Sequence, residues 1–465
     1  MNKKFRDLYY TLSANIITLL IGVITGFVLP AYLGYNDYNY IRVFSFYITY
    51  VGITHFGFLD GIYIKYGAYD YDDLPREKFR AYFKFMLLLQ LVEAIVLGFG
   101  VCLFTADKDR NIVMLFVVIN MVLINMAMLF SFIHQFTRRF KLFSFNTIFT
   151  KLFYGIGCVV LLLINQYGYV YYIIIQTIVN FIVVIIYIIN NKEIVFGKSE
   201  SIKNSFNEYK SIFGIGFLAM MGNFTTLLVL GIDRLIVDRF MTKYDFAMYS
   251  FAYTLVSLFL VLLSSVTSVI YPFLTRSDKS KYDSVYKISR YAISFVMTFA
   301  LSGYFIISFI VERFVSKYTD SLEILIYLIP TIVCSGIINI LVQNMYKVLK
   351  ATKDYTKNNL VALVIAVVTN IVAFAIFRSS ISVAIATLIS FVLWIIYSDR
   401  YFCKLLNITV IRYQIFDIII FVLFIAIAQF FKWYIGIFIY IAVLILINLL
   451  FFRKELKNIV LLVKK

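Results

Sequence analysis

Long apolar segments recur along almost the whole chain, and each is close to the ~20 residues that a membrane-spanning helix needs. Hydrophobic residues make up 62% of the chain and charged residues 15%, which is more apolar side chain than a soluble core requires. The sequence therefore predicts an all-α polytopic membrane protein with about fourteen transmembrane helices. We expect them near residues 8–32, 40–64, 82–104, 111–134, 143–165, 170–190, 212–238, 246–275, 288–311, 322–346, 358–377, 381–398, 414–431 and 434–452.

Basic residues are distributed unevenly between the loops of this ladder. With the N-terminus in the cytoplasm, the cytoplasmic segments, among them Arg276 to Arg290, hold 32 of the 43 Lys and Arg residues. The outer segments hold nine, and Lys151 and Arg234 lie within spans. Cytoplasmic loops of multi-span proteins carry such an excess. The bias predicts that both termini are cytoplasmic, and it explains the net charge of +18 without any nucleic-acid partner.

An internal repeat is visible, because an offset of 208 residues aligns the first predicted span with the seventh. Asn15 then aligns with Asn223, and Thr18 with Thr226. Six spans return the chain to the same side of the membrane, so the halves are expected to be parallel repeats. The predicted domains are an N-terminal six-helix lobe (1–197), a C-terminal six-helix lobe (206–404), two additional transmembrane helices (411–453) and a basic cytoplasmic tail (454–465).

Polar side chains recur at helical spacing on both repeat-start spans. Asn15 and Thr18 lie one turn apart on the first, as do Asn223 and Thr226 on the seventh. Such residues hydrogen-bond between neighbouring transmembrane helices in many proteins. Alternatively, they line a water-filled cleft between two lobes, where a transporter of this symmetry holds its substrate.

Ionisable residues also fall inside the predicted spans, where each costs roughly 3 kcal/mol and usually faces a partner or a cavity. An ion pair would satisfy them without any function, and Arg234 and Asp238 share a helix face and are spaced to pair. Alternatively, Arg234 and Lys151 indicate a cleft that receives a negatively charged passenger. Four further residues are candidates for ion coupling: Asp60, Glu93, His55 and Asp233.

Motifs for catalysis and metal binding are poor. The chain has two histidines, His55 and His134, and its four cysteines are scattered without CxxC spacing. The stretch from Asp70 to Asp73 resembles the DxD motif of sugar-nucleotide enzymes, but acidic residues in a loop without a nucleotide-binding domain are more often solvated. We therefore expect a protein that is not an enzyme, with no catalytic residues, metal site or cofactor.

Several segments resemble a known family, the bacterial polysaccharide flippases. The matching segments are Leu33 to Tyr40, Phe56 to Tyr66, Gly231 to Ile236, Tyr244 to Tyr253 and Ile270 to Arg276. Within them, Gly57 and Gly61 have the GxxxG spacing that allows close approach of helix backbones. Asn39 and Ala247 depart from the pattern, because the family often has glycine at these turns.

The resemblance covers nearly the whole chain and implies a member of the multidrug/oligosaccharidyl-lipid/polysaccharide exporter superfamily. Such a protein has two six-helix lobes around an alternating-access cleft. The implied substrate is an undecaprenyl-diphosphate-linked oligosaccharide, turned to the outer leaflet of the bacterial cytoplasmic (inner) membrane for lipopolysaccharide O-antigen, capsule or exopolysaccharide assembly. In that cleft Arg234 or Lys151 would offset the diphosphate charge. The sugar hydrogen bonds would come from Asn15, Asn223, Thr18 and Thr226.

The implied partners are this lipid-linked oligosaccharide, the lipid bilayer, and a polysaccharide polymerase with its chain-length machinery. Two alternative functions stay open. A multidrug or cation antiporter would share the fold, and only a substrate test separates it from a flippase. A membrane polysaccharide polymerase is expected to carry a large basic outer loop, whereas no predicted outer loop exceeds roughly a dozen residues.

Overall fold

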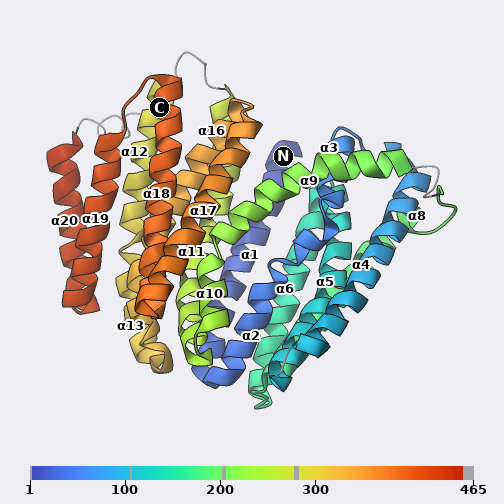
Figure 1. Ribbon diagram of the computed structural model, residues 1–465, viewed down its shortest axis with the longest axis horizontal. Coiled ribbons are helices and arrows are strands. Elements are labelled where there is room, and N and C mark those ends of the chain that lie inside the picture. The colour runs from blue at the N-terminus through green and yellow to red at the C-terminus, as the bar shows by residue number, and fades with distance from the viewer. Residues whose placement is uncertain (1–2, 105–106, 202–205, 277–281, 454–465) are drawn as a thin grey trace. The chain divides into compact units, whose positions relative to one another are not determined.

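The computed structural model describes residues 3–104, 107–201, 206–276 and 282–453. All regular structure in these ranges is helical and none of it is strand, which confirms the predicted all-α class (Figure 1). Twelve helical stretches of this described part are long and apolar enough to cross a membrane. They correspond one to one with the third to the fourteenth predicted span. The chain is therefore a multi-pass membrane protein. The basic tail predicted at 454–465 lies outside the described residues.

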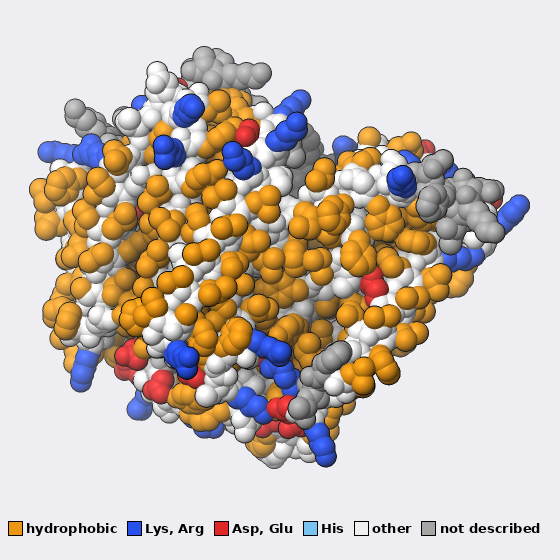
Figure 2. Space-filling view, in the orientation of Figure 1, with side chains coloured by type: hydrophobic (Ala, Val, Ile, Leu, Met, Phe, Trp, Pro, Cys, Tyr) orange, Lys and Arg blue, Asp and Glu red, His pale blue; other side chains and the backbone are white. Residues whose placement is uncertain are grey.

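Hydrophobic side chains cover the middle of these helices on the face shown in Figure 2, while Lys and Arg side chains gather toward the helix ends. This distribution is the one that a bilayer selects, since its hydrocarbon interior accepts apolar side chains and its interfaces accept charges.

By its contacts the chain divides into two compact units, residues 1–227 and 228–465. The division falls inside α9 (Phe206–Val229), so most of this helix belongs to the first unit. The lobe boundaries expected from the repeat, with a second lobe beginning at 206, stay a prediction.

The first unit is built around α5, which packs against α4 and α7, while α1 packs against α6. Its core includes the buried rings of Phe58, Tyr82, Phe130 and Tyr187. Besides α9, its helices are α1 (Lys3–Tyr32), α2 (Tyr35–Ile48), η1 (Val51–His55), α3 (Phe58–Tyr66), η2 (Tyr71–Asp73), α4 (Arg76–Phe104), α5 (Lys108–Phe136), α6 (Phe140–Leu163), α7 (Tyr169–Asn190) and α8 (Lys192–Val195).

In the second unit the paired helices α17 and α18 pack against each other, and α11 packs against α14. Ala247 lies within α11, as Asn39 lies within α2, so neither position is a turn. The helices of this unit are α10 (Ile232–Phe240), α11 (Lys243–Arg276), α12 (Tyr282–Ala300), α13 (Gly303–Phe314), η4 (Ser316–Tyr318), α14 (Ser321–Leu328), α15 (Thr331–Gly336), the π-helical η5 (Ile337–Val342), α16 (Gln343–Val348), α17 (Thr352–Phe377), α18 (Ser380–Leu406), α19 (Ile411–Phe430) and α20 (Trp433–Phe451).

The last two helices, α19 and α20, lie beside α12 and α13 in this unit (Figure 1). Buried polar contacts hold α20 to α12. The Tyr440 hydroxyl donates to the carbonyl oxygen of Thr298 at 2.6 Å, and the Tyr291 hydroxyl donates to Asn448 Oδ1 at 2.7 Å. These helices are thus integrated into the second unit by specific hydrogen bonds.

Candidate functional site

The second predicted span is interrupted, although no proline lies within it. Helix α2 ends at Ile48, a short 3-10 turn follows, and α3 begins only at Phe58. Phe56 and Gly57 between them have φ angles of 49° and 82°, in the left-handed region. Glycine enters this region freely, but a residue with a side chain pays roughly 1–2 kcal/mol. Surrounding contacts must therefore maintain the break.

Close contact between backbones holds α3 against α9. A Cβ atom on Gly57 would lie 2.4 Å from the backbone nitrogen of Phe217, and one on Gly61 would lie 2.1 Å from the carbonyl oxygen of Ile212. On α9, a Cβ on Gly216 would lie 1.9 Å from the carbonyl oxygen of Gly57. The close approach expected from the GxxxG spacing is confirmed, and its partner is α9.

Gly61→Ala is expected to destabilise the detergent-purified protein by about 1–3 kcal/mol, the usual cost of overpacking. The new methyl group would meet the fixed backbone of Ile212 rather than a side chain that can move. Gly100→Ala in α4 is the matched control, because a Cβ there would have nothing within 4 Å. Fluorescence-monitored unfolding would measure both variants, and equal effects would contradict the backbone contact.

A second attachment of α9 is made by Glu208 near its start. This carboxylate accepts hydrogen bonds from Lys65 Nζ at 2.5 Å, Lys78 Nζ at 2.8 Å and the Tyr82 hydroxyl at 2.7 Å. Two lysines and a tyrosine from α3 and α4 thus converge on one acid. The ion pairs and the glycine contacts together fix the first half of α9 within the first unit.

The interruption leaves a cavity of about 190 Å³ in the first unit. His55 is 3% exposed, and its Nδ1 accepts a hydrogen bond from the backbone N–H of Gly57 at 3.1 Å. In a neutral ring the proton is therefore on Nε2. That atom lies 3.6 Å from Asp60 Oδ2, too far for a hydrogen bond but close enough for an ion pair when the ring is protonated. The lining includes Tyr50, His55, Asp60, Met128 and Asn223.

Two buried amides satisfy the backbone at the break. Asn125 Nδ2 on α5 donates to the carbonyl oxygen of Val51 at 3.0 Å and to Gln90 Oε1 at 2.8 Å. Gln90 Nε2 on α4 lies 3.3 Å from the carbonyl oxygen of Thr54 and 2.8 Å from Glu93 Oε2. Non-helical backbone inside a membrane span requires such donors. Neither amide was among the sequence-predicted site residues, and their only signal was a polar side chain within an apolar segment.

The structure brings together some of the predicted site residues. His55, Asp60 and Asn223 line one cavity. Glu93 accepts a hydrogen bond from Gln90, which also contacts the backbone of the break at Thr54. Thr18 on α1 and Thr226 on α9 are half-buried, and Lys151 on α6 is exposed. The side chain of Asn15 lies outside the described part of the structure.

Asp233 and Arg234 lie at the start of α10 in the second unit. Asp233 is 2% exposed and accepts hydrogen bonds from the Tyr249 hydroxyl at 2.8 Å and from the backbone N–H of Arg234 at 2.7 Å. The Arg234 guanidinium lies over the ring of Tyr253, 3.5 Å from its centroid. The pairing of Arg234 with Asp238 stays a prediction.

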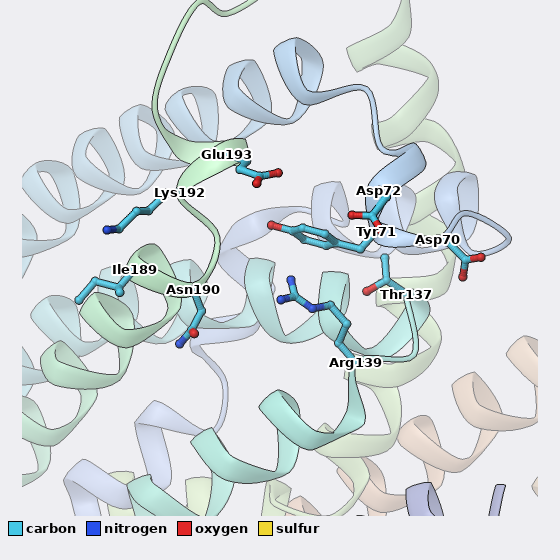
Figure 3. A pocket seen from close by; sticks show the side chains of 9 residues that line it. All are labelled: Asp70, Tyr71, Asp72, Thr137, Arg139, Ile189, Asn190, Lys192 and Glu193. Atoms are coloured by element: carbon cyan, nitrogen blue, oxygen red, sulfur yellow. The ribbon is translucent and has the colours of Figure 1, made fainter. Parts of the chain in front are cut away.

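A larger polar cavity, about 710 Å³, lies among loops that the charge bias places in the cytoplasm (Figure 3). The Arg139 guanidinium lies 4.0 Å from the centroid of the Tyr71 ring and donates to Asn191 Oδ1 at 3.3 Å. Burial raises the pKa of the Tyr71 hydroxyl, which keeps it protonated. Asp70 and Asp72 are exposed at the rim, as expected for solvated acids. The lining residues are Asp70, Tyr71, Asp72, Thr137, Arg139, Ile189, Asn190, Lys192 and Glu193.

Comparison with known proteins identifies both a family and a fold. The sequence model of the family described as polysaccharide biosynthesis protein matches residues 76–323. No curated protein matches the chain. Among solved structures, the lipid II flippase MurJ in an inward closed conformation is similar with a TM-score of 0.70 and 18% identity, covering 97% of this chain and 100% of that chain.

Transporters of the MOP superfamily are also similar. One from Pyrococcus furiosus gives a TM-score of 0.56 at 11% identity, covering 87% of this chain and 96% of that chain. An outward-facing multidrug resistance transporter of the MATE family gives 0.57 at 11% identity, covering 86% of this chain and 97% of that chain. At these identities the likeness shows a shared fold, and it confirms the fold expected from the sequence.

Proposed function

Since the chain belongs to the polysaccharide biosynthesis protein family, we propose that it is a flippase for an undecaprenyl-diphosphate-linked oligosaccharide repeat unit. It would move this unit from the cytoplasmic to the outer leaflet of the bacterial cytoplasmic membrane by alternating access. The sugar–diphosphate head is too polar to cross hydrocarbon unaided, whereas the lipid tail can stay in the bilayer. The fold shared with a lipid II flippase supports a lipid-linked passenger, and the family supports a polysaccharide head.

The interrupted second span carries this proposal. Broken helices at membrane depth are tolerated where they are buried in protein or line a cavity, and transporters use them to bind polar solutes. Here the break places Tyr50, His55 and Asp60 beside Asn223 around one cavity. Hydroxyl, imidazole, carboxylate and amide groups together supply both donors and acceptors for sugar hydroxyls.

We assign the other sequence-predicted site residues to binding of the same lipid-linked substrate. Arg234 and Lys151 would offset the diphosphate charge, and Asn15, Thr18 and Thr226 would add hydrogen bonds to the sugar. Transfer between leaflets breaks no covalent bond, so we assign no catalytic residue. A polymerase and its chain-length machinery would take up the product on the outer side.

His55 and Asp60 are the pair that we propose for ion coupling, with Glu93 and Asp233 as further candidates. Asp60→Asn removes the anion that stabilises a protonated His55. We therefore expect the pH profile of transport to shift toward acid, because a lower pH is then needed to protonate the ring. Transport measured against pH and sodium would test this. An unchanged dependence in Asp60→Asn, Glu93→Gln and His55→Gln alike would refute ion coupling at this site.

Deletion of the gene in its host tests the flippase function itself. We expect the complete lipid-linked repeat unit to accumulate on the cytoplasmic leaflet and the wild-type gene to reverse this. Single repeat units already exposed outside would indicate a polymerase instead. No accumulation combined with altered drug sensitivity would indicate the antiporter.

A further inference from the structure

Three ionisable side chains meet in the interior of the second unit. Arg290 on α12 and Asp399 on α18 are 0% exposed, and Asp417 on α19 is 4% exposed. Arg290 Nε lies 3.2 Å from Asp399 Oδ2, and its Nη2 lies 2.7 Å from Asp417 Oδ2. The charge bias counted Arg290 with a cytoplasmic segment, and the structure shows that its side chain is buried inside the helix bundle.

The charges of this cluster do not balance. One guanidinium, which is always protonated in proteins, faces two carboxyl groups, so two ionised aspartates would leave a net charge of −1. An uncompensated buried charge costs several kcal/mol. No second cation among the described residues forms a hydrogen bond or an ion pair with these three side chains. A single bound proton would restore neutrality.

Among the described residues, the neighbouring elements add no cation that bonds to the cluster. The Tyr286 hydroxyl donates a hydrogen bond to Asp399. Two thiols, Cys334 on α15 and Cys403 on α18, lie within electrostatic range of the cluster. Lys287 on α12 is half-buried. It lies within electrostatic range of Cys403 and bonds neither aspartate. On α14, Tyr327 contacts Gln429 near the far end of α19, and α20 turns the uncharged Asn448 toward Tyr291.

Hydrogen bonding distinguishes the two aspartates. Asp399 accepts from the Tyr286 hydroxyl at 2.7 Å, from Arg290 Nε at 3.2 Å and from Gln414 Nε2 at 3.0 Å. Asp417 accepts from Arg290 on Oδ2, and the Ser294 hydroxyl also lies within hydrogen-bonding reach of this carboxyl group. The buried Oδ1 of Asp417 has no hydrogen-bond partner in the described structure. Three donors favour an ionised Asp399, and the oxygen without a donor is the natural position for a proton.

We propose that Arg290, Asp399 and Asp417 form a proton-binding site in the second unit, with the proton carried on Asp417 Oδ1. The site is distinct from the His55–Asp60 pair of the first unit and does not depend on the identity of the transported molecule. Asp417 lies six residues into α19, roughly 9 Å from the start of the helix by its rise. The charge bias places that end in the cytoplasm, from which the proton would exchange.

Infrared spectroscopy of the detergent-purified full chain tests the site directly. We expect a protonated carboxyl C=O band at pH 7 that disappears in Asp417→Asn and persists in Asp354→Asn. Asp354 is the matched control, because it lies at the exposed end of α17, where its Oδ2 accepts from the Tyr401 hydroxyl. Absence of a band that depends on Asp417 would overturn the proposal.

Thermal unfolding provides a second measurement. Asparagine at 417 imitates the protonated acid, so we expect Asp417→Asn to keep the wild-type midpoint at pH 7, whereas Asp399→Asn lowers it. Equal losses in the two variants would contradict the assignment of the proton to Asp417. A wild-type midpoint that rises when sodium chloride replaces choline chloride, and does so only with Asp417 present, would show a bound cation and overturn the proton site.

Discussion

Arg290→Met is expected to be among the most destabilising single substitutions in the second unit. It removes the cation that faces Asp399 and Asp417, while the ionised carboxylate stays buried. Breaking a buried ion pair from one side typically costs about 3–5 kcal/mol. Denaturation in detergent, followed by tryptophan or tyrosine fluorescence, would measure the loss.

Two further variants sharpen this prediction. Lys287→Met removes a half-buried cation from the same helix and should change stability by no more than about 0.5 kcal/mol. Combining Arg290→Met with Asp399→Asn removes both partners of the ion pair and should restore much of the lost stability. If the double variant is less stable than Arg290→Met alone, buried charge is not the cause.

Asn125→Leu is expected to reduce transport at least tenfold, which corresponds to about 1.4 kcal/mol. The substitution removes the donor to the Val51 carbonyl, the Thr54 hydroxyl and Gln90. A buried acceptor left without its donor costs about 1–3 kcal/mol, and the chain can avoid this cost by rearranging the break. Accumulation of the lipid-linked repeat unit in a complemented deletion strain would report the loss of transport.

Asn120→Leu is the control for this substitution. Asn120 is buried on the same helix and bonds Thr177 and Asn180 on α7, away from the interrupted span. It should lower stability to a similar degree but retain most of the transport activity. Similar transport losses in both variants would mean that the break itself has no special role.

Span positions could be predicted because they depend on the length and hydrophobicity of one segment at a time. The twelve apolar helices fall on predicted spans for this reason. The break in the second span could not be predicted in the same way, because it contains no proline. Its geometry depends on Asn125 and Gln90, which come from two other helices, and on the left-handed conformation of Phe56.

The predicted site residues show the same limit. His55 and Asp60 were identifiable as ionisable residues inside a span, and the structure pairs them. The burial of Arg290 could not be predicted, because a basic residue near a span end indicates a topological role and its partner Asp417 lies 127 residues further along the chain. Buried pairs between distant helices leave no signal in the local sequence.

The attachment of α9 to α3 and α4 determines where the chain can be divided into fragments. A first fragment that stops before Phe206 would lack the helix that covers Gly57 and Gly61, and it would lack the Glu208 carboxylate that accepts hydrogen bonds from Lys65 and Lys78. A fragment that extends through Leu230 keeps all of these contacts. The natural division for separate expression therefore lies where α9 ends and α10 begins, within what the hydropathy pattern presents as a single span.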